Sequence, residues 1–97
     1  PGLLEEAIRQ VLESRDTLFK GIQELSKKHS AIEKIYEPCT NFVFLQVKDA
    51  QKIHAELLAH SIAVRLIGGK YLRITAGTEE ENRSVLAALE DILTKEG

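Results

Sequence analysis

The sequence has few cysteines and no long apolar run, so it offers little for disulfide bonds or for a membrane-spanning helix. A single cysteine, Cys39, cannot form an internal disulfide bond, which favours a reducing, cytoplasmic setting and a structural role for this thiol. No apolar run approaches the ~20 residues that a membrane-spanning helix needs, and no apolar signal segment opens the chain. Neither a disulfide-rich secreted protein nor a membrane protein is therefore predicted.

The chain also lacks an excess of either charge. Its 13 Lys and Arg residues and 15 Asp and Glu residues are interspersed and give a formal net charge of −2. Because surfaces that bind nucleic acid are strongly basic, no nucleic-acid partner is predicted. The histidines do not cluster with cysteine or carboxylates at metal-ligand spacing, and no nucleophile–base combination stands out, so no metal site and no catalytic residue is predicted. These histidines are His29, His54 and His60.

A length of 97 residues with 43% hydrophobic content fits a single domain, residues 1–97, with a modest core. The chain starts at Pro1 and contains no methionine, which we take as an indication that it is a piece of something larger. Apolar residues recur at helical spacing from Leu3 to about Lys28, with a bend expected near Ser14 to Asp16 or at Gly21 if anywhere. So long a helix exceeds what a small sheet can cover, and we expect residues 1–29 to lead in from another domain.

The rest of the chain alternates between strand and helix patterns. The segment 41–47 is rich in aromatic and branched residues and is expected to be a well-buried strand. Asp49 is expected to cap the following helix, and Thr78 with Glu81 forms the pattern of a capping box. Strands are expected at 32–36, 41–47, 62–67 and 71–75, and helices at 3–28, 50–60 and from 78 onward. The order α-β-β-α-β-β-α predicts an α+β domain with helices on one face of a mainly antiparallel sheet.

Two arginines lie in the predicted hairpin of 62–67 and 71–75. If Leu66 and Leu72 face the core, strand alternation requires them to be opposite each other, which leaves a three-residue loop of Gly68, Gly69 and Lys70. Arg65 then lies directly opposite Arg73, on the face away from the helices. Like charges at opposed positions disfavour a hairpin, and a bound oxyanion would reverse that penalty because guanidinium groups chelate oxyanions. An anion site is one interpretation, and two ordinary surface arginines is the other.

Two blocks of sequence resemble histidinol-phosphate aminotransferases. The similarity covers nearly the whole chain, and its specific part is a "VR" strand followed by an "LRIT-GT-EEN" strand and helix start, together with an "NF" strand. The matching residues here are Ala63-Val64-Arg65, Tyr71 to Asn82, and Asn41-Phe42-Val43-Phe44-Leu45. Three departures are Ser61, where the family usually has glycine, Ala76, where valine or isoleucine is more usual, and the short turn of Gly68 and Gly69.

The resemblance implies a fold-type I enzyme that uses pyridoxal phosphate, a homodimer of histidine biosynthesis, with a large cofactor domain and a small domain. This chain looks like the small C-terminal domain, and the cofactor lysine would belong to the missing large domain. By the resemblance, Arg73 would bind the phosphate of histidinol phosphate, which is a phosphorylated amino alcohol. It would also bind the carboxylate of glutamate, which forms from 2-oxoglutarate in the other half of the reaction. Arg65 would help to hold the phosphate.

Other interpretations stay open. Threonine-phosphate decarboxylases and aromatic aminotransferases share a domain that resembles these two blocks of sequence. The β-α-β-β-α order from 41 to 93 is also close to a stand-alone, ferredoxin-like ligand-binding regulatory module. A third possibility is an interaction domain whose first helix docks to a partner.

Overall fold

The computed structural model describes residues 2–38 and 41–96. Cys39 and Thr40, including the predicted structural role of the thiol, lie outside the described residues. Three helices and four strands follow one another in the predicted order. The elements are α1 (Gly2–Lys28), β1 (Ile32–Ile35), β2 (Phe42–Val47), α2 (Ala50–Ala59), β3 (Arg65–Ile67), β4 (Tyr71–Thr75) and α3 (Glu79–Glu96).

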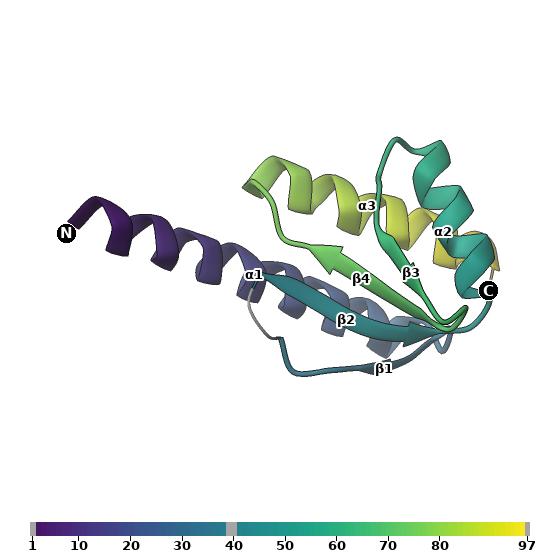
Figure 1. Ribbon diagram of the computed structural model, residues 1–97. Helices are drawn as coiled ribbons and strands as arrows, with labels where there is room; N and C mark the ends of the chain where they lie inside the picture. The colour runs from purple at the N-terminus through teal and green to yellow at the C-terminus, as the bar shows by residue number, and fades with distance from the viewer. Residues whose placement is uncertain (1, 39–40, 97) are drawn as a thin grey trace.

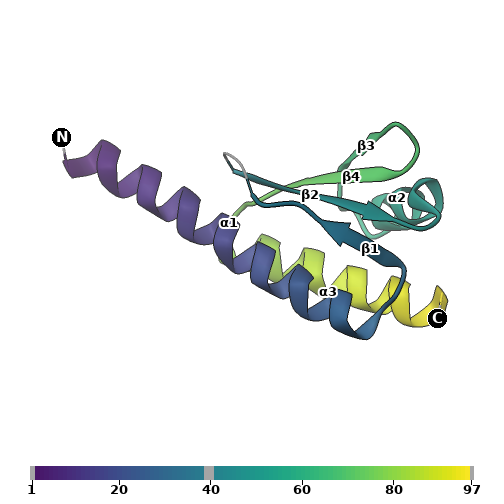
Figure 2. The ribbon, with the colours of Figure 1, turned by 90° about the horizontal axis from the view of Figure 1, so that it is seen from below.

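The four strands form one antiparallel sheet in the order β1-β2-β4-β3 (Figure 1). The chain reaches β3 from β2 by way of α2, so β4 comes to lie between β2 and β3. Helices α1 and α3 run side by side under the sheet (Figure 2). The predicted α+β class, with helices on one face of an antiparallel sheet, is confirmed.

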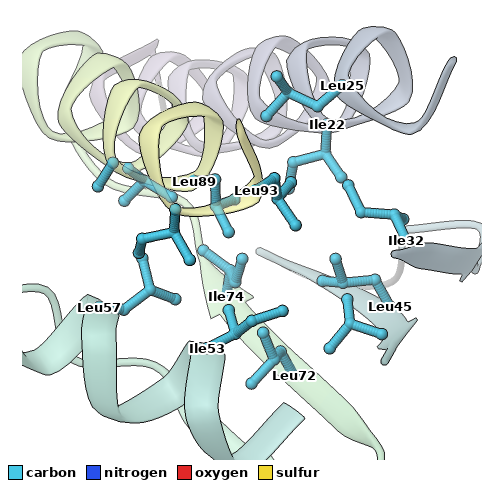
Figure 3. Packing of buried hydrophobic residues seen from close by; sticks show 14 of the residues in the cluster. Ile22, Leu25, Ile32, Leu45, Ile53, Leu57, Leu72, Ile74, Leu89 and Leu93 are labelled. Atoms are coloured by element: carbon cyan, nitrogen blue, oxygen red, sulfur yellow. The ribbon is translucent and has the colours of Figure 1, made fainter. Parts of the chain in front are cut away.

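The core lies between the sheet and the helices. Ile53 and Leu57 of α2 meet Leu72 and Ile74 of β4, with Leu89 of α3 packed above them (Figure 3). All five are at most 1% exposed. A single cluster of aliphatic side chains from every layer thus holds the domain together.

Strand β2 is half-buried and not buried on both faces, which corrects the expectation for this segment. Val43, Leu45 and Val47 are buried, whereas the residues that alternate with them, among them Phe42 and Phe44, are only partly buried. A hydrophobic run predicts a strand covered on both sides, but here the aromatic residues lie on the face that the helices leave uncovered.

Helix α1 is a single helix from Gly2 to Lys28, without the interruption considered at 14–16 or at Gly21. Gly21 has a different use, because a Cβ atom added there would meet the Leu86 side chain of α3 at 2.5 Å. The glycine lets the two helices approach closely. The N-terminal half of α1 extends beyond the sheet (Figure 1), and its large apolar residues are exposed. Leu3 is 90% exposed, Leu4 68% and Ile8 51%.

The predicted start of α3 is confirmed and that of α2 is wrong in its detail. The Glu81 N–H donates to Thr78 Oγ1 at 3.1 Å, and the Thr78 N–H donates to Glu81 Oε1 at 2.8 Å, which is a complete capping box. Asp49 does occupy the cap position of α2, but with φ 52°, and its side chain makes no capping hydrogen bond. Asp49 tolerates the left-handed turn instead, as short polar residues do.

Candidate functional site

The hairpin of β3 and β4 has the predicted register. Leu66 pairs with Leu72, and Arg65 pairs with Arg73. Gly68 and Gly69 have φ angles of 62° and 71°, a conformation that glycine adopts without strain, so the three-residue loop is confirmed. Strand β3 itself is shorter than expected, since residues 62–64 are not paired as strand.

The alternation of the strands assigns Arg65 and Arg73 to one face of the sheet. Leu72 and Ile74, the neighbours of Arg73 along β4, are buried under the helices, so the Arg73 side chain lies on the opposite face. Arg65 shares that face because it pairs with Arg73 directly. We call this surface, which the helices leave uncovered (Figure 2), the open face. It includes Lys34, Tyr36, Phe42, Phe44, Gln46, Arg65, Tyr71, Arg73 and Thr75.

The two guanidinium groups have no carboxylate partner among residues 2–38 and 41–96. Arg65 is exposed and Arg73 is partly buried. Within the same described ranges, the buried Nε atom of Arg73 has no hydrogen-bond acceptor. An unmatched buried donor is costly unless something else accepts its hydrogen bond, and such groups are rare in native proteins. In a chain whose net charge is −2, two adjacent cations without a carboxylate at ion-pair distance in the described residues indicate a place for an anionic ligand.

A shallow, open depression contains both arginines. His54, Val64 and Thr75 are among the residues that line it. His54 is held by a contact of 3.1 Å between its Nε2 atom and the Val64 carbonyl oxygen, so it is a structural neighbour of the pair. The lining contains no lysine among the described residues, and therefore no group here that could carry an aldehyde cofactor covalently.

Tyr36, Phe42 and Phe44 of the open face were not recognised from the sequence as part of this surface. The Phe44 ring stacks on Tyr71 at 5.1 Å between centroids, and Tyr36 lies 5.4 Å from Phe44. Burial raises the pKa of the Tyr36 hydroxyl, and the adjacent Tyr71 raises it further by repulsion and by a hydrogen bond. Phe42 lies instead under Arg73, whose guanidinium carbon is 5.0 Å from the ring centroid. The sequence does not reveal which strand pairs with β4, and only the order β1-β2-β4-β3 brings these rings beside the arginines.

A second depression lies between the first half of α1 and the connection from β4 to α3. At its edge Asn82, only 3% exposed, joins these segments. Its Nδ2 atom donates to Ser14 Oγ at 2.7 Å, its Oδ1 atom accepts from the Gly77 N–H at 2.9 Å, and Ser14 Oγ donates to the Gly77 carbonyl. These polar groups satisfy one another, which indicates a structural joint and not a ligand site.

The other residues that were considered from the sequence lie apart from the arginines. His60 faces Asp91 on α3 at 3.9 Å between Nε2 and Oδ2, and His29 lies at the end of α1. No group of three or more His, Cys, Asp or Glu residues in the described part of the chain could hold a metal ion. No helix within the described residues is long and apolar enough to cross a membrane.

Comparison with known proteins gives one consistent group. No family model matches the sequence. The chain is 38% identical over 90 residues to histidinol-phosphate aminotransferase 1 of Carboxydothermus hydrogenoformans, a match that covers 89% of this chain and 24% of the relative. The chain spans about a quarter of the length of the curated relatives that it matches.

Solved structures give the same fold. The structure of the histidinol-phosphate aminotransferase from Clostridium acetobutylicum superimposes with a TM-score of 0.78 at 22% identity, over 94% of this chain and 28% of that one. A decarboxylase from Sulfurospirillum multivorans superimposes with a TM-score of 0.75 at 28% identity, over 92% of this chain and 24% of that one. The α+β arrangement described above is thus that of one part of much longer enzymes, most of them aminotransferases by name.

Proposed function

We propose that this chain is the small C-terminal domain of a pyridoxal-phosphate-dependent aminotransferase that acts on histidinol phosphate, and that Arg65 and Arg73 bind the anionic groups of its substrates. The observation that carries the proposal is the pairing of the two arginines on the open face, where neither has a carboxylate partner among the described residues. The similarity to histidinol-phosphate aminotransferases along nearly the whole chain supports the same assignment.

The depression beside the arginines does not form a cradle for the cofactor, because its described lining has no lysine. We therefore assign pyridoxal phosphate to the part of the enzyme outside this chain. When bound there, the cofactor supplies the electron sink for amino-group transfer. The exposed apolar residues of α1, such as Leu4 and Ile8, support the assignment of 1–29 as a segment that meets a large domain.

Within that enzyme the arginines orient the substrate. A phosphate or carboxylate held by Arg73 fixes one end of the substrate, so the amine at the other end approaches the cofactor in one orientation. A phosphate dianion offers more acceptor oxygens than a carboxylate and can engage Arg65 as well. Arg73 thus serves histidinol phosphate and glutamate alike, whereas Arg65 contributes mainly to the phosphate. The wider assignment, a homodimeric enzyme of histidine biosynthesis, belongs to the same proposal.

The test uses the complete enzyme that contains this chain. The Arg73→Ala variant is expected to lower kcat/KM about 30-fold or more for both histidinol phosphate and glutamate, since breaking a desolvated charge pair costs on the order of 2–5 kcal/mol. The Arg65→Ala variant should affect histidinol phosphate more than glutamate. Arg83→Ala is the matched control, because Arg83 is exposed on α3 and lies near Glu79.

Three results would contradict the proposal. Unchanged kinetics in Arg73→Ala would exclude the anion site. A loss for only one of the two substrates would exclude the dual role of Arg73. An equal loss for glutamate in Arg65→Ala would exclude the preference of Arg65 for phosphate.

A second candidate is a decarboxylase that acts on a phosphorylated amino acid, such as threonine phosphate, and the similarity to the Sulfurospirillum decarboxylase favours it. Such an enzyme also needs an anion clamp, so the arginines do not separate the two reactions. Release of carbon dioxide from threonine phosphate in the absence of 2-oxoglutarate would favour the decarboxylase. Glutamate formation that depends on both histidinol phosphate and 2-oxoglutarate would favour the aminotransferase.

A further inference from the structure

Phe42 and Arg73 form a contact that the anion site itself does not require. The Arg73 guanidinium carbon lies 5.0 Å from the centroid of the Phe42 ring. Phe42 pairs with Thr75 across the β2–β4 ladder, and Phe44 pairs with Arg73, so Phe42 is the diagonal neighbour of the arginine. Diagonal neighbours on one face of a sheet lie within reach of aromatic and long side chains. The contact is therefore set by the register of two central strands.

The other aromatic residues of the open face are engaged differently. Tyr36, Phe44 and Tyr71 contact one another through their rings, with centroids 5.1 to 6.3 Å apart. No ring contact of Phe42 with these three is found in the described part of the chain, where its partner is the guanidinium group. Tyr36 also has a cation over its ring, since Lys34 Nζ lies 4.8 Å from the ring centroid, but Tyr36 contacts other rings as well. Phe42 differs in that its contact is with the guanidinium group of Arg73 alone among the ring and cation contacts of the described residues.

A ring is a suitable support for a cation that must bind a ligand. The face of an aromatic ring attracts a guanidinium group through its quadrupole, but it has no lone pair that accepts a conventional hydrogen bond. A carboxylate in the same place would occupy the N–H donors of Arg73. With the ring there, the N–H donors of Arg73 are not taken up by a carboxylate, and its buried Nε atom has no acceptor among residues 2–38 and 41–96.

The cost of ordering is the second consideration. An arginine side chain has several rotatable bonds, and a ligand that must immobilise it binds more weakly for that reason. A guanidinium group that already rests on Phe42 has lost part of this freedom before the ligand arrives. Arg65, which is exposed and has no such contact among the described residues, lacks this preorganisation.

We propose that Phe42 is a positioning residue, which holds the Arg73 guanidinium group in place for an oxyanion and so makes Arg73 the primary anchor and Arg65 the secondary one. The inference rests on the proposed function, because it assumes that the arginine pair binds an anion. It adds the residue that orders the site.

The experiment follows the arginine side-chain Nε–Hε signals of the 97-residue chain by NMR, with inorganic phosphate as the probe. In the free protein, the Arg73 guanidinium group should be more ordered than that of Arg83, and the Phe42 ring should shift its Hε signal upfield. Phosphate should move the signals of Arg73 and Arg65 and leave that of Arg83 in place. An Arg73 group as mobile as that of Arg83 would overturn the proposal without any variant.

Three variants complete the test. Phe42→Leu keeps apolar bulk without the ring and should weaken phosphate binding about threefold to tenfold, as expected for the loss of a cation–π contact. Phe42→Tyr restores the ring and should bind within about twofold of the wild type. Tyr36→Leu removes an aromatic residue of the same face whose cationic neighbour is Lys34 and not Arg73, and should bind like the wild type.

The outcomes separate the two proposals. If phosphate moves neither arginine in the wild-type chain, the anion site is wrong and the role of Phe42 falls with it. If the wild type binds phosphate and a folded Phe42→Leu variant binds equally well, only the role of Phe42 is wrong. If Phe42→Leu does not fold, the order of the Arg73 group in the wild type and the affinity of Phe42→Tyr decide, and a several-fold loss in Phe42→Tyr would overturn the proposal.

Discussion

The same strands present aliphatic residues to the helices and aromatic or cationic residues to the open face. On β4, Leu72 and Ile74 are at most 1% exposed, whereas Tyr71 and Arg73, which alternate with them, are only partly buried. The helix-covered face is held by burial of apolar area, which has no directional demand. The open face has defined ring and cation–ring contacts and, in Arg73 Nε, a buried donor without an acceptor among the described residues. One face therefore serves stability, and the other retains groups that a ligand can use.

The largest expected effect is on the helix-covered face. Leu72→Ala should lower the free energy of unfolding by about 2–5 kcal/mol, because a fully buried leucine leaves a cavity that the core fills only in part. Tyr71→Ala, one residue away on the open face, should cost less than Leu72→Ala, and about 0.5–1.5 kcal/mol of its cost should come from the lost stacking on Phe44. Urea unfolding followed by circular dichroism measures both. Equal losses would show that the two faces contribute alike.

Asn82 is an exception to the contrast between an apolar helix side and a polar open face, because it is a buried polar residue on the helix side. Asn82→Ala should cost about 1–3 kcal/mol, since the Gly77 N–H and the Ser14 hydroxyl lose a partner inside the protein. The control is Ser84→Ala at an exposed position of the same helix. A cost no greater than that of the control would mean that water replaces the lost hydrogen bonds.

The contrast between the faces explains which features could be predicted from sequence. The hairpin register was predictable because Leu66 and Leu72 must both be buried, and that condition alone sets Arg65 opposite Arg73. The capping box of Thr78 and Glu81 is a local pattern and was also predictable. Features that depend on one face or on one turn thus follow from the residues.

Features that depend on distant segments did not. Asn82 lies 68 residues from Ser14 along the chain, and no local pattern indicates their hydrogen bonds. The contact of Phe42 with Arg73 requires β2 to be the neighbour of β4, which alternation within a strand does not reveal. Asp49 shows that a local pattern can also mislead. Its residue type favours a capping hydrogen bond, but its backbone adopts a left-handed turn and its side chain makes no such bond.

The smallest expected effect concerns the arginine pair without a ligand. Two like charges directly opposite each other on a hairpin destabilise it by about 0.2–1 kcal/mol, so Arg65→Gln should raise the free energy of unfolding by that amount at low salt. The gain should shrink as salt screens the repulsion, and phosphate should stabilise the wild type more than the variant. Arg83→Gln is the matched control, because Arg83 lies near the carboxylate of Glu79 and should lose a little stability instead. Urea unfolding at low salt, at high salt and with phosphate measures all three. A loss of stability in Arg65→Gln at low salt would mean that the two guanidinium groups do not repel each other, and that no anion is needed to hold them side by side.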